Sequence, residues 1–499
     1  MRFRRIAAVV AVALVAACGT PPVRPPAPLP ATYYTDAAGG SRPVDAETLA
    51  RWWEAFDDPL LAELATTALA RNLDLQAALA ELRVARAQLR QSRAALYPQL
   101  DLAGQGSRQW IDTGQLADSA PGQALGIDDE ARVETWQLAL QAQWEIDLFG
   151  ANRLRSAGAA RQAQAAEAQL VAVRLAVASN LAQGYVQARA LLAQRSLLDD
   201  ALRLAREFER VAEGRFRLGE ATRLDVEAAA AQRVSLEAQR GDLDAALAEA
   251  TFALDTLLDL PPGSVRARLG DDGRIPLADA EIPQGQPLDL LRRRPDVIAA
   301  AAALEGAELA ALASRRDLFP KIGASVAAGR SGFGLDDLSA ASDLRQLAVQ
   351  VGFPWLDFGA RRAAIDLADA QADAGFVQLR QALAAALQEV EVAAAQLAAR
   401  RAQREARRAA LASAERTHAM ARRTYEVGLA NLGDVLDAEN GLVEARRQLL
   451  DTERALALAQ VALYTALGGG WDVAPARTAA EAVAREAAGV QDRIRAPEE

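Results

Sequence analysis

Several residue types are almost absent from this chain of 499 residues. It contains one cysteine (Cys18), one histidine (His418) and one lysine (Lys321). A single cysteine excludes a disulfide within the chain. A lone histidine without a cysteine partner is more typical of a solvated residue than of a metal ligand. The sequence therefore predicts no metal site and no cofactor beyond any covalent modification.

Signatures of nucleic-acid binding and of catalysis are also missing. The formal net charge is −10, which argues against a nucleic-acid partner. No glycine-rich phosphate loop stands between a strand pattern and a helix pattern, and no Ser/His/Asp arrangement is available from one histidine. We expect a protein that is not an enzyme.

Proline is absent from two long stretches, Ala151 to Leu260 and Trp355 to Ala474. Both are rich in Ala, Leu, Gln, Glu and Arg, which favour helix, and their apolar residues recur at seven-residue spacing. Gly219 and Gly428 interrupt these stretches and predict hairpin turns. At 1.5 Å per residue, a helix over 151–217 would be roughly 100 Å long. The shorter helices over 222–259 and 73–96 would match that length only if stacked end to end.

The chain repeats itself. Asp74-Leu75 and Tyr97-Pro98 recur 222 residues later as Asp296-Val297 and Phe319-Pro320. A repeated unit of this size indicates one architecture used twice. We therefore expect the following organisation: a signal peptide at 1–17, a lipidated linker at 18–48, a first repeat at 49–290 (β-hairpin about 99–149, helical hairpin about 151–260), a second repeat at 291–474 (β-hairpin about 320–358, helical hairpin about 360–467) and a tail at 475–499.

Two segments alternate between apolar and polar residues, with period two. Their apolar positions are Trp136, Leu138, Leu140 and Trp144 in the first segment, and Val349, Val351 and Phe353 in the second. Strands of about ten residues with tryptophan near their ends are typical of membrane barrels with an aromatic girdle. A soluble hairpin packed on a core is the alternative. Four strands cannot close a barrel in lipid, so several copies must combine, and three copies give twelve strands with room for a passage.

The N-terminus reads as a targeting signal. Arg2, Arg4 and Arg5 precede an apolar run that is too short to span a bilayer. Val15-Ala-Ala-Cys18 resembles a bacterial lipobox, which predicts a lipid on Cys18. An ordinary secretory signal with an incidental cysteine is the alternative.

Four motifs carry a family resemblance: Arg51–Leu60, Ala68–Leu75, Leu291–Val297 and Tyr425–Ala438. The first three resemble outer-membrane efflux lipoproteins, and the last resembles the hairpin tip of TolC-like ducts. The chain is most similar to the NodT/OprM-type subgroup. The resemblance implies a mainly α fold with a membrane β-barrel: a trimeric channel-tunnel with four strands and long coiled-coil helices per chain. It also implies a lipid-anchored outer-membrane location with a long periplasmic extension, a periplasmic adaptor and an inner-membrane resistance-nodulation-division (RND) pump.

Site residues follow from the same resemblance. Asp434 and Asp437, with Asp225 as the repeat-one counterpart of Asp434, would form the periplasmic gate, where rings of carboxylates favour cations. Helix capping is the alternative for these aspartates. The surfaces that meet the adaptor would be the hairpin tips, which comprise Arg217, Leu218, Gly219, Val427, Gly428 and Leu429.

Two other functions remain open from the sequence. One is a duct for protein secretion with an ABC-type pump. The other is a periplasmic helical scaffold without a pore, which would have no need of lipid-facing rows of Trp, Leu and Val.

Overall fold

The computed structural model describes residues 30, 32–35, 49–121, 130–278, 282, 287–289, 293–335, 338–353, 356–427, 429 and 432–471. Cys18 and Gly428, to which the sequence assigns roles, lie outside these residues.

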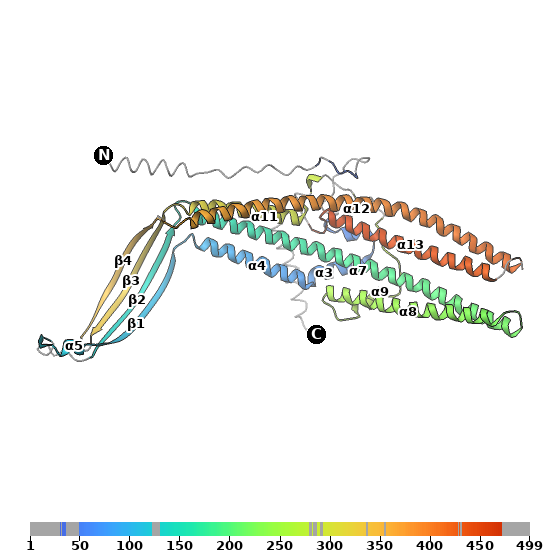
Figure 1. Cartoon of the computed structure of the whole chain (residues 1–499), viewed down its shortest axis with the longest axis horizontal. Coiled ribbons are helices and arrows are strands. Elements are labelled where there is room, and N and C mark those ends of the chain that lie inside the picture. Colours follow the sequence, from blue (N-terminus) through green and yellow to red (C-terminus); the bar gives the residue numbers. More distant parts are fainter. Residues whose placement is uncertain are drawn as a thin grey trace, which may run out of the picture. The chain divides into compact units, whose positions relative to one another are not determined.

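Four strands form one antiparallel sheet in the order β1-β2-β3-β4 (Figure 1). The strands are β1 (Gln99–Asp112), β2 (Glu130–Ile146), β3 (Lys321–Leu335) and β4 (Leu338–Gly352), and the short helix α5 (Gly114–Ala117) follows β1. They contain 14, 17, 15 and 15 residues, so the predicted length of about ten residues is wrong. The apolar alternation marks only part of each strand. Backbone pairing continues beyond it into polar rows such as Arg108 opposite Glu134.

Long helices form the rest of the described chain. They are α7 (Ala151–Arg217), α8 (Arg223–Leu257), α12 (Ala360–Glu426) and α13 (Leu432–Ala466), with the shorter α4 (Leu73–Ala94) and α11 (Pro295–Arg316). These bounds agree closely with the helices expected from the absence of proline and the heptad spacing. Corresponding helices of the two predicted repeats have equal lengths of 67, 35 and 22 residues. Besides α5, four short helices were not predicted from the sequence: η1 (Trp52–Phe56), α3 (Pro59–Arg71), α9 (Ser264–Leu269) and η2 (Pro287–Asp289).

Short helices meet the ends of the returning helices, as the length argument expected. Asn72, just before α4, donates from Nδ2 to the Leu257 carbonyl at the end of α8 (2.9 Å). Arg294, just before α11, donates from Nη1 to the Ala466 carbonyl at the end of α13 (3.1 Å). Asn72 and Arg294 are only 3% and 7% exposed. Each junction thus satisfies a carbonyl that the end of a helix leaves without a partner.

An aromatic cluster forms part of the core next to these junctions. Trp52, which is fully buried, stacks on Tyr464 with ring centroids 5.5 Å apart and packs edge-on against Phe56. Asp58 caps α3 by accepting from the backbone N–H groups of Leu60 and Leu61 (3.0 and 3.2 Å). The Trp-Trp motif near residue 52 therefore supplies the core rather than an exposed surface.

Two compact units divide the chain, and each draws on both predicted repeats. One contains the sheet, within Val84–Ala163 and Ala302–Val377. The other contains most of the helical hairpins, within Pro26–Arg83, Gln164–Ala301 and Gln378–Glu499. By length and composition alone, α11 and α12 are apolar enough to cross a membrane, although only 28% and 33% of their most apolar stretches are buried.

Candidate functional site

One face of the sheet is apolar, as the alternation predicts. Residues directly opposite each other in an antiparallel ladder point to the same face. Trp144 lies opposite Ala324, which lies opposite Val349. The exposed apolar side chains of this face are Leu100, Leu102, Trp110, Trp136, Leu138, Leu140, Trp144, Val326, Leu347, Val349 and Val351, between 39% and 76% exposed. Phe353, 56% exposed, directly follows β4.

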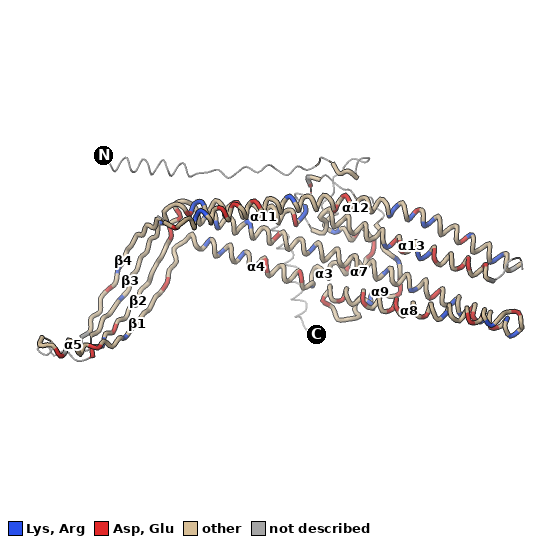
Figure 2. The backbone as a smooth tube through the Cα atoms, viewed as in Figure 1, with Lys and Arg blue, Asp and Glu red and all other residues tan. Residues whose placement is uncertain are grey.

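The other face of the sheet is mainly polar and uncharged. One row runs through Gln105, Gln137, Ser331 and Ser342. Phe333 is an exception, because its register opposite Thr135 places it on this polar face. Figure 2 shows that the strands carry few charged residues, whereas both signs of charge are spread along the helices. The sheet therefore separates an apolar surface from a polar one.

Trp136 occupies its position because a glycine lies opposite it. A side chain at Gly332 would collide with the Trp136 indole. Glycine therefore allows this ring to lie against the sheet, which fixes an aromatic group near one end of the apolar face.

Two edges of the sheet have no partner strand among the described residues: β1 pairs only with β2, and β4 only with β3. In hydrocarbon, each unsatisfied backbone group costs several kcal/mol. A sheet with an apolar face and two open edges is complete only when further strands pair with β1 and β4.

The tip of the first helical hairpin is built from two capping motifs. At the end of α7, Glu220 N–H donates to the Arg215 carbonyl (2.9 Å), and Gly219 N–H donates to the Phe216 carbonyl (3.0 Å). Gly219 has φ +76°, the left-handed conformation that this Schellman motif requires. The predicted turn at Gly219 is thus confirmed.

Asp225 belongs to the second of these motifs. Its carboxylate accepts from Thr222 N–H (2.8 Å) and Thr222 Oγ1 (2.7 Å), while Thr222 Oγ1 accepts from Asp225 N–H, a reciprocal capping box. The backbone bond from Thr222, followed by the hydroxyl bond, lowers the pKa of Asp225 below its usual value. Capping, the alternative expected for Asp225, is therefore present.

The tip of the second hairpin presents apolar side chains. Val427 and Leu429 are 69% and 82% exposed. Leu429 N–H donates to the Thr424 carbonyl (2.9 Å). This bond joins residues five positions apart, like the bond from Glu220 to Arg215 at the first tip. Asp434 lies in the first turn of α13, and Asp437 is exposed one turn further on.

A cavity of about 600 Å³ brings two of the predicted gate residues together. It lies between α7, α8 and α13, and both Asp225 and Asp437 line it, whereas Asp434 does not. Apolar residues such as Phe208 and Leu436 form other parts of its wall.

One contact between the two hairpins was not predicted from the sequence. Arg215 of α7 donates from Nη2 to the Tyr425 hydroxyl of α12, and its guanidinium carbon lies 5.7 Å from the centre of the Tyr425 ring. The repeat alignment contained a signal for this contact. Tyr425 corresponds to Phe216, and the added hydroxyl requires a polar partner once it is half-buried.

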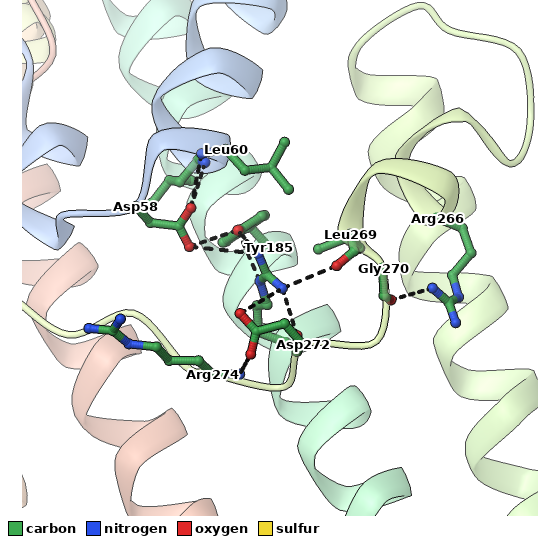
Figure 3. A network of polar contacts seen from close by, with 10 residues as sticks. Asp58, Leu60, Tyr185, Arg266, Leu269, Gly270, Asp272 and Arg274 are labelled. Carbon is green, nitrogen blue, oxygen red and sulfur yellow. Dashed lines mark hydrogen bonds and ion pairs between the residues drawn. The ribbon is translucent and has the colours of Figure 1, made fainter.

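A buried polar network holds the segment after α9 against α7 (Figure 3). Tyr185 donates its hydroxyl hydrogen to Asp58 (2.7 Å) and accepts from Arg189 Nη2 (2.7 Å). Arg189 Nη1 also donates to the carbonyls of Leu269 and Asp272 (3.3 and 2.6 Å). Burial and, secondarily, the bond to Asp58 raise the pKa of Tyr185 well above its usual value. The network therefore holds a connecting segment in place.

His418 is not the solvated residue that was expected. Its Nε2 lies 2.6 Å from Glu439 Oε2, and the two side chains are only 23% and 18% exposed. The pair joins α12 to α13. No group of three or more His, Cys, Asp or Glu residues suited to a metal ion occurs among the described residues.

Comparisons with known proteins agree with this architecture. The model of the outer membrane efflux protein family matches residues 64–259 and 287–469. The cation efflux system protein CusC of Escherichia coli O6:H1 is 30% identical over 461 residues, which covers 90% of this chain and 94% of CusC. The pyoverdine export outer membrane protein OpmQ of Pseudomonas aeruginosa is 29% identical over 485 residues, covering 94% and 98%. The solved structure of the outer-membrane channel OprN has a TM-score of 0.77 and 27% identity, covering 91% of this chain and 99% of OprN.

The chain belongs to the outer membrane efflux protein family, a family of transport channels. It is an outer-membrane channel of the NodT/OprM type, with a TolC-like fold and a periplasmic extension. The resemblance seen in the sequence motifs is thereby confirmed.

Proposed function

We propose that this protein is the exit duct of a tripartite efflux system and passively conducts small molecules to the cell exterior. An inner-membrane RND-type pump would supply the energy, and a periplasmic adaptor would connect the pump to the duct. The observation that carries the proposal is the sheet, which has one apolar face and two open edges. Such a sheet can exist in lipid only as part of a closed barrel.

The assembly that fits is a homotrimer. Two copies would supply eight strands, whose interior is filled by side chains, whereas three supply twelve and leave room for a passage. The sparsely buried apolar stretches of α11 and α12 offer surface for packing between copies. The equal helix lengths support the proposed division into repeats at 49–290 and 291–474. With two similar repeats in each chain, a ring of three copies would consist of six similar segments.

The gate would lie at the hairpin tips. Asp437 and Asp434 of three copies would place six carboxylates near the axis, where they favour cations. Asp225 would act mainly as a cap at this level. The exposed tip residues Leu218, Val427 and Leu429 would contact the adaptor, because apolar side chains at a turn gain most from being covered by a partner.

The cargo would be chosen by the pump rather than by the duct. CusC and OpmQ, at nearly equal identity to this chain, are named for cations and for pyoverdine, which differ greatly in size and chemistry. A wide tube of this family therefore imposes little chemistry on what passes through it.

Bilayer conductance tests the proposed duct. Full-length protein extracted from outer membranes should migrate as an oligomer that heat converts to monomer on a gel, and it should form ion-conducting channels in planar bilayers. Heat-treated protein serves as the control. A monomer that stays soluble without detergent and conducts nothing would favour the pore-free scaffold instead.

Lipid attachment at Cys18, which lies outside the described residues, is tested separately. Wild-type protein should incorporate radioactive palmitate, and Cys18→Ser should abolish the label because no other cysteine is present. Ser179→Ala, at a buried position far along the chain from the signal, serves as a control that should keep the label. Label that persists in the Cys18 variant would contradict the lipobox.

A further inference from the structure

Two tryptophan rows bracket a band on the apolar face of the sheet. Trp144 shares its row with Ala324 and Val349, and Trp136 shares its row with Gly106 and Gly332. The two tryptophans are eight residues apart on β2, about 27 Å along the strand. With a tilt of about 40°, this corresponds to roughly 21 Å of height, close to the apolar band of about 25 Å in membrane barrels.

Charged residues occur at one place within this band. The described residues in the three rows between the tryptophans, on the apolar face, include only three charges: Arg330, Asp343 and Arg345. Arg330 and Asp343 lie opposite each other and form an ion pair at 3.5 Å. Arg345 lies opposite Ala328, in the same row as Leu140, which is the middle row of the band.

Arg345 lacks a compensating charge. It is exposed, and no ion pair of its guanidinium occurs within the described part of the chain. An arginine on the lipid face near the midplane costs about 2–4 kcal/mol. Asp343 can balance only one of the two arginines, so this surface keeps one net positive charge.

Within the band, the described residues of this face include no acidic side chain other than Asp343. In the proposed barrel, β4 pairs with β1 of the next copy. Between the two tryptophan rows, the β1 residues on the apolar face are Leu100, Leu102 and Gly104, none of which is acidic. The remaining source of a negative charge is the lipid that contacts this face.

The direction along the strands identifies the leaflet. β2 runs from the Trp136 row to Trp144 and then directly into α7, so the Trp144 row is at the periplasmic side. From Arg345 towards that side the β4 residues of this face are Leu347, Val349 and Val351, all apolar. Towards the Trp136 side are Arg330 and Asp343. Because a long arginine side chain extends towards the nearer polar region, Arg345 extends to the outer leaflet.

We propose that Arg345 and Arg330 form a binding site for the phosphate of a phosphorylated lipid in the outer leaflet. Two guanidinium groups on adjacent strands, offset diagonally, suit the oxygen atoms of one phosphate, which they bind through charge-assisted hydrogen bonds. The inference rests on the proposed barrel, since only a barrel exposes this face to lipid.

Lipid retention by the full-length oligomer in detergent tests the site. The oligomer is incubated with the phosphorylated glycolipid lipid A, and the retained lipid is counted by native mass spectrometry. Arg345→Gln should lower the affinity about tenfold, the effect of losing one charged hydrogen bond. Lys321→Gln is the control, because Lys321 begins β3 at the periplasmic end and lies near Glu145 and Asp317 (3.8 and 3.6 Å), so retention should not change.

Asp343→Asn tests the site without removing a cation. Freeing Arg330 from its carboxylate should increase retention about threefold or more, since a competing negative charge is lost. Unchanged or weaker retention in this variant would overturn the proposal, as would equal retention by Arg345→Gln and wild type.

Further measurements distinguish binding of a lipid from binding of free phosphate. They also distinguish failure of the lipid site from failure of the proposed duct. Lipid A without its phosphates should be retained as poorly by wild type as intact lipid A is by Arg345→Gln. Displacement of intact lipid by equimolar inorganic phosphate would show a phosphate site and overturn the lipid assignment. Planar-bilayer conductance should be equal in wild type and Arg345→Gln. Lost retention with intact conductance supports the site, whereas a wild type without conductance overturns the proposed duct.

Discussion

At the scale of single residues, two buried polar side chains connect the helices that have to act as one column. Asn72 accepts from Leu75 N–H through Oδ1 (3.0 Å) and donates through Nδ2 to the Leu257 carbonyl. It therefore caps one helix and satisfies the end of another. Arg294 satisfies the end of α13 in the same way, through its bond to the Ala466 carbonyl. It also binds Glu389 and Asp296 at 2.6 Å.

Asn72→Ala should destabilise this junction by about 2–3 kcal/mol, because α4 loses its cap and a buried carbonyl loses its donor. Thermal unfolding should begin at lower temperature, and hydrogen exchange should become faster in segments 70–80 and 250–260. Asn440→Ala makes the same chemical change at an exposed position of α13 and should leave stability nearly unchanged. Equal effects of both variants would contradict the role of the Asn72 amide.

The sequence revealed residues with local functions better than residues with distant partners. The turn at Gly219 and the cap at Asp225 follow from spacing within a few positions. Asn72 bonds a residue 185 positions away, and Tyr185 bonds one 127 positions away. No local pattern indicates such pairs, so the junctions and the Arg189 network required the structure.

At the scale of secondary-structure elements, absences in the sequence were the best guide. Because proline is missing from both long stretches and a glycine interrupts each of them, the helix expected over about 151–217 coincides with α7, and the hairpin expected over about 360–467 begins where α12 begins. Strand lengths could not be predicted, since the apolar alternation marks only part of each strand. Backbone pairing of β1 with β2 continues past it to Asp112 and Glu130.

Neighbouring residues of β2 provide a test of the two faces. Leu140→Arg should add about 2–4 kcal/mol of cost per copy near the midplane and should strongly reduce heat-modifiable oligomer in the outer membrane. Gln141→Arg places the same side chain on the opposite, polar face, where it should assemble normally. The amounts of oligomer are compared on unheated gels. Normal assembly of Leu140→Arg would contradict a lipid-facing position.

At the scale of the whole molecule, the family follows from motifs spread along the chain, whereas the assembly follows from what one copy lacks. Because a single sheet leaves two edges open, the number of copies is set by how many sheets are needed to close a barrel. The cavity at the hairpin tips was not predicted from the motifs. It groups Asp437 with Asp225, while the resemblance grouped Asp437 with Asp434.

The proposed gate is tested at this scale. Asp434→Ala combined with Asp437→Ala should raise single-channel conductance and weaken block by trivalent cations about tenfold or more, because six carboxylates leave the axis. Glu227→Ala, which removes an exposed acidic side chain of α8 near the first tip, serves as the control and should change the block little. Block that is unchanged in the double variant would reject the gate assignment.

The open edges have a further consequence for how a ring of subunits fails. In the proposed trimer, β4 of one copy would meet β1 of the next, so every contact would be head-to-tail and no copy could substitute for its own missing neighbour. One subunit with a damaged edge would therefore spoil a ring that also contains sound subunits. In a cell that makes both forms, the share of intact rings would fall as the cube of the sound fraction, so a single faulty gene copy would be dominant.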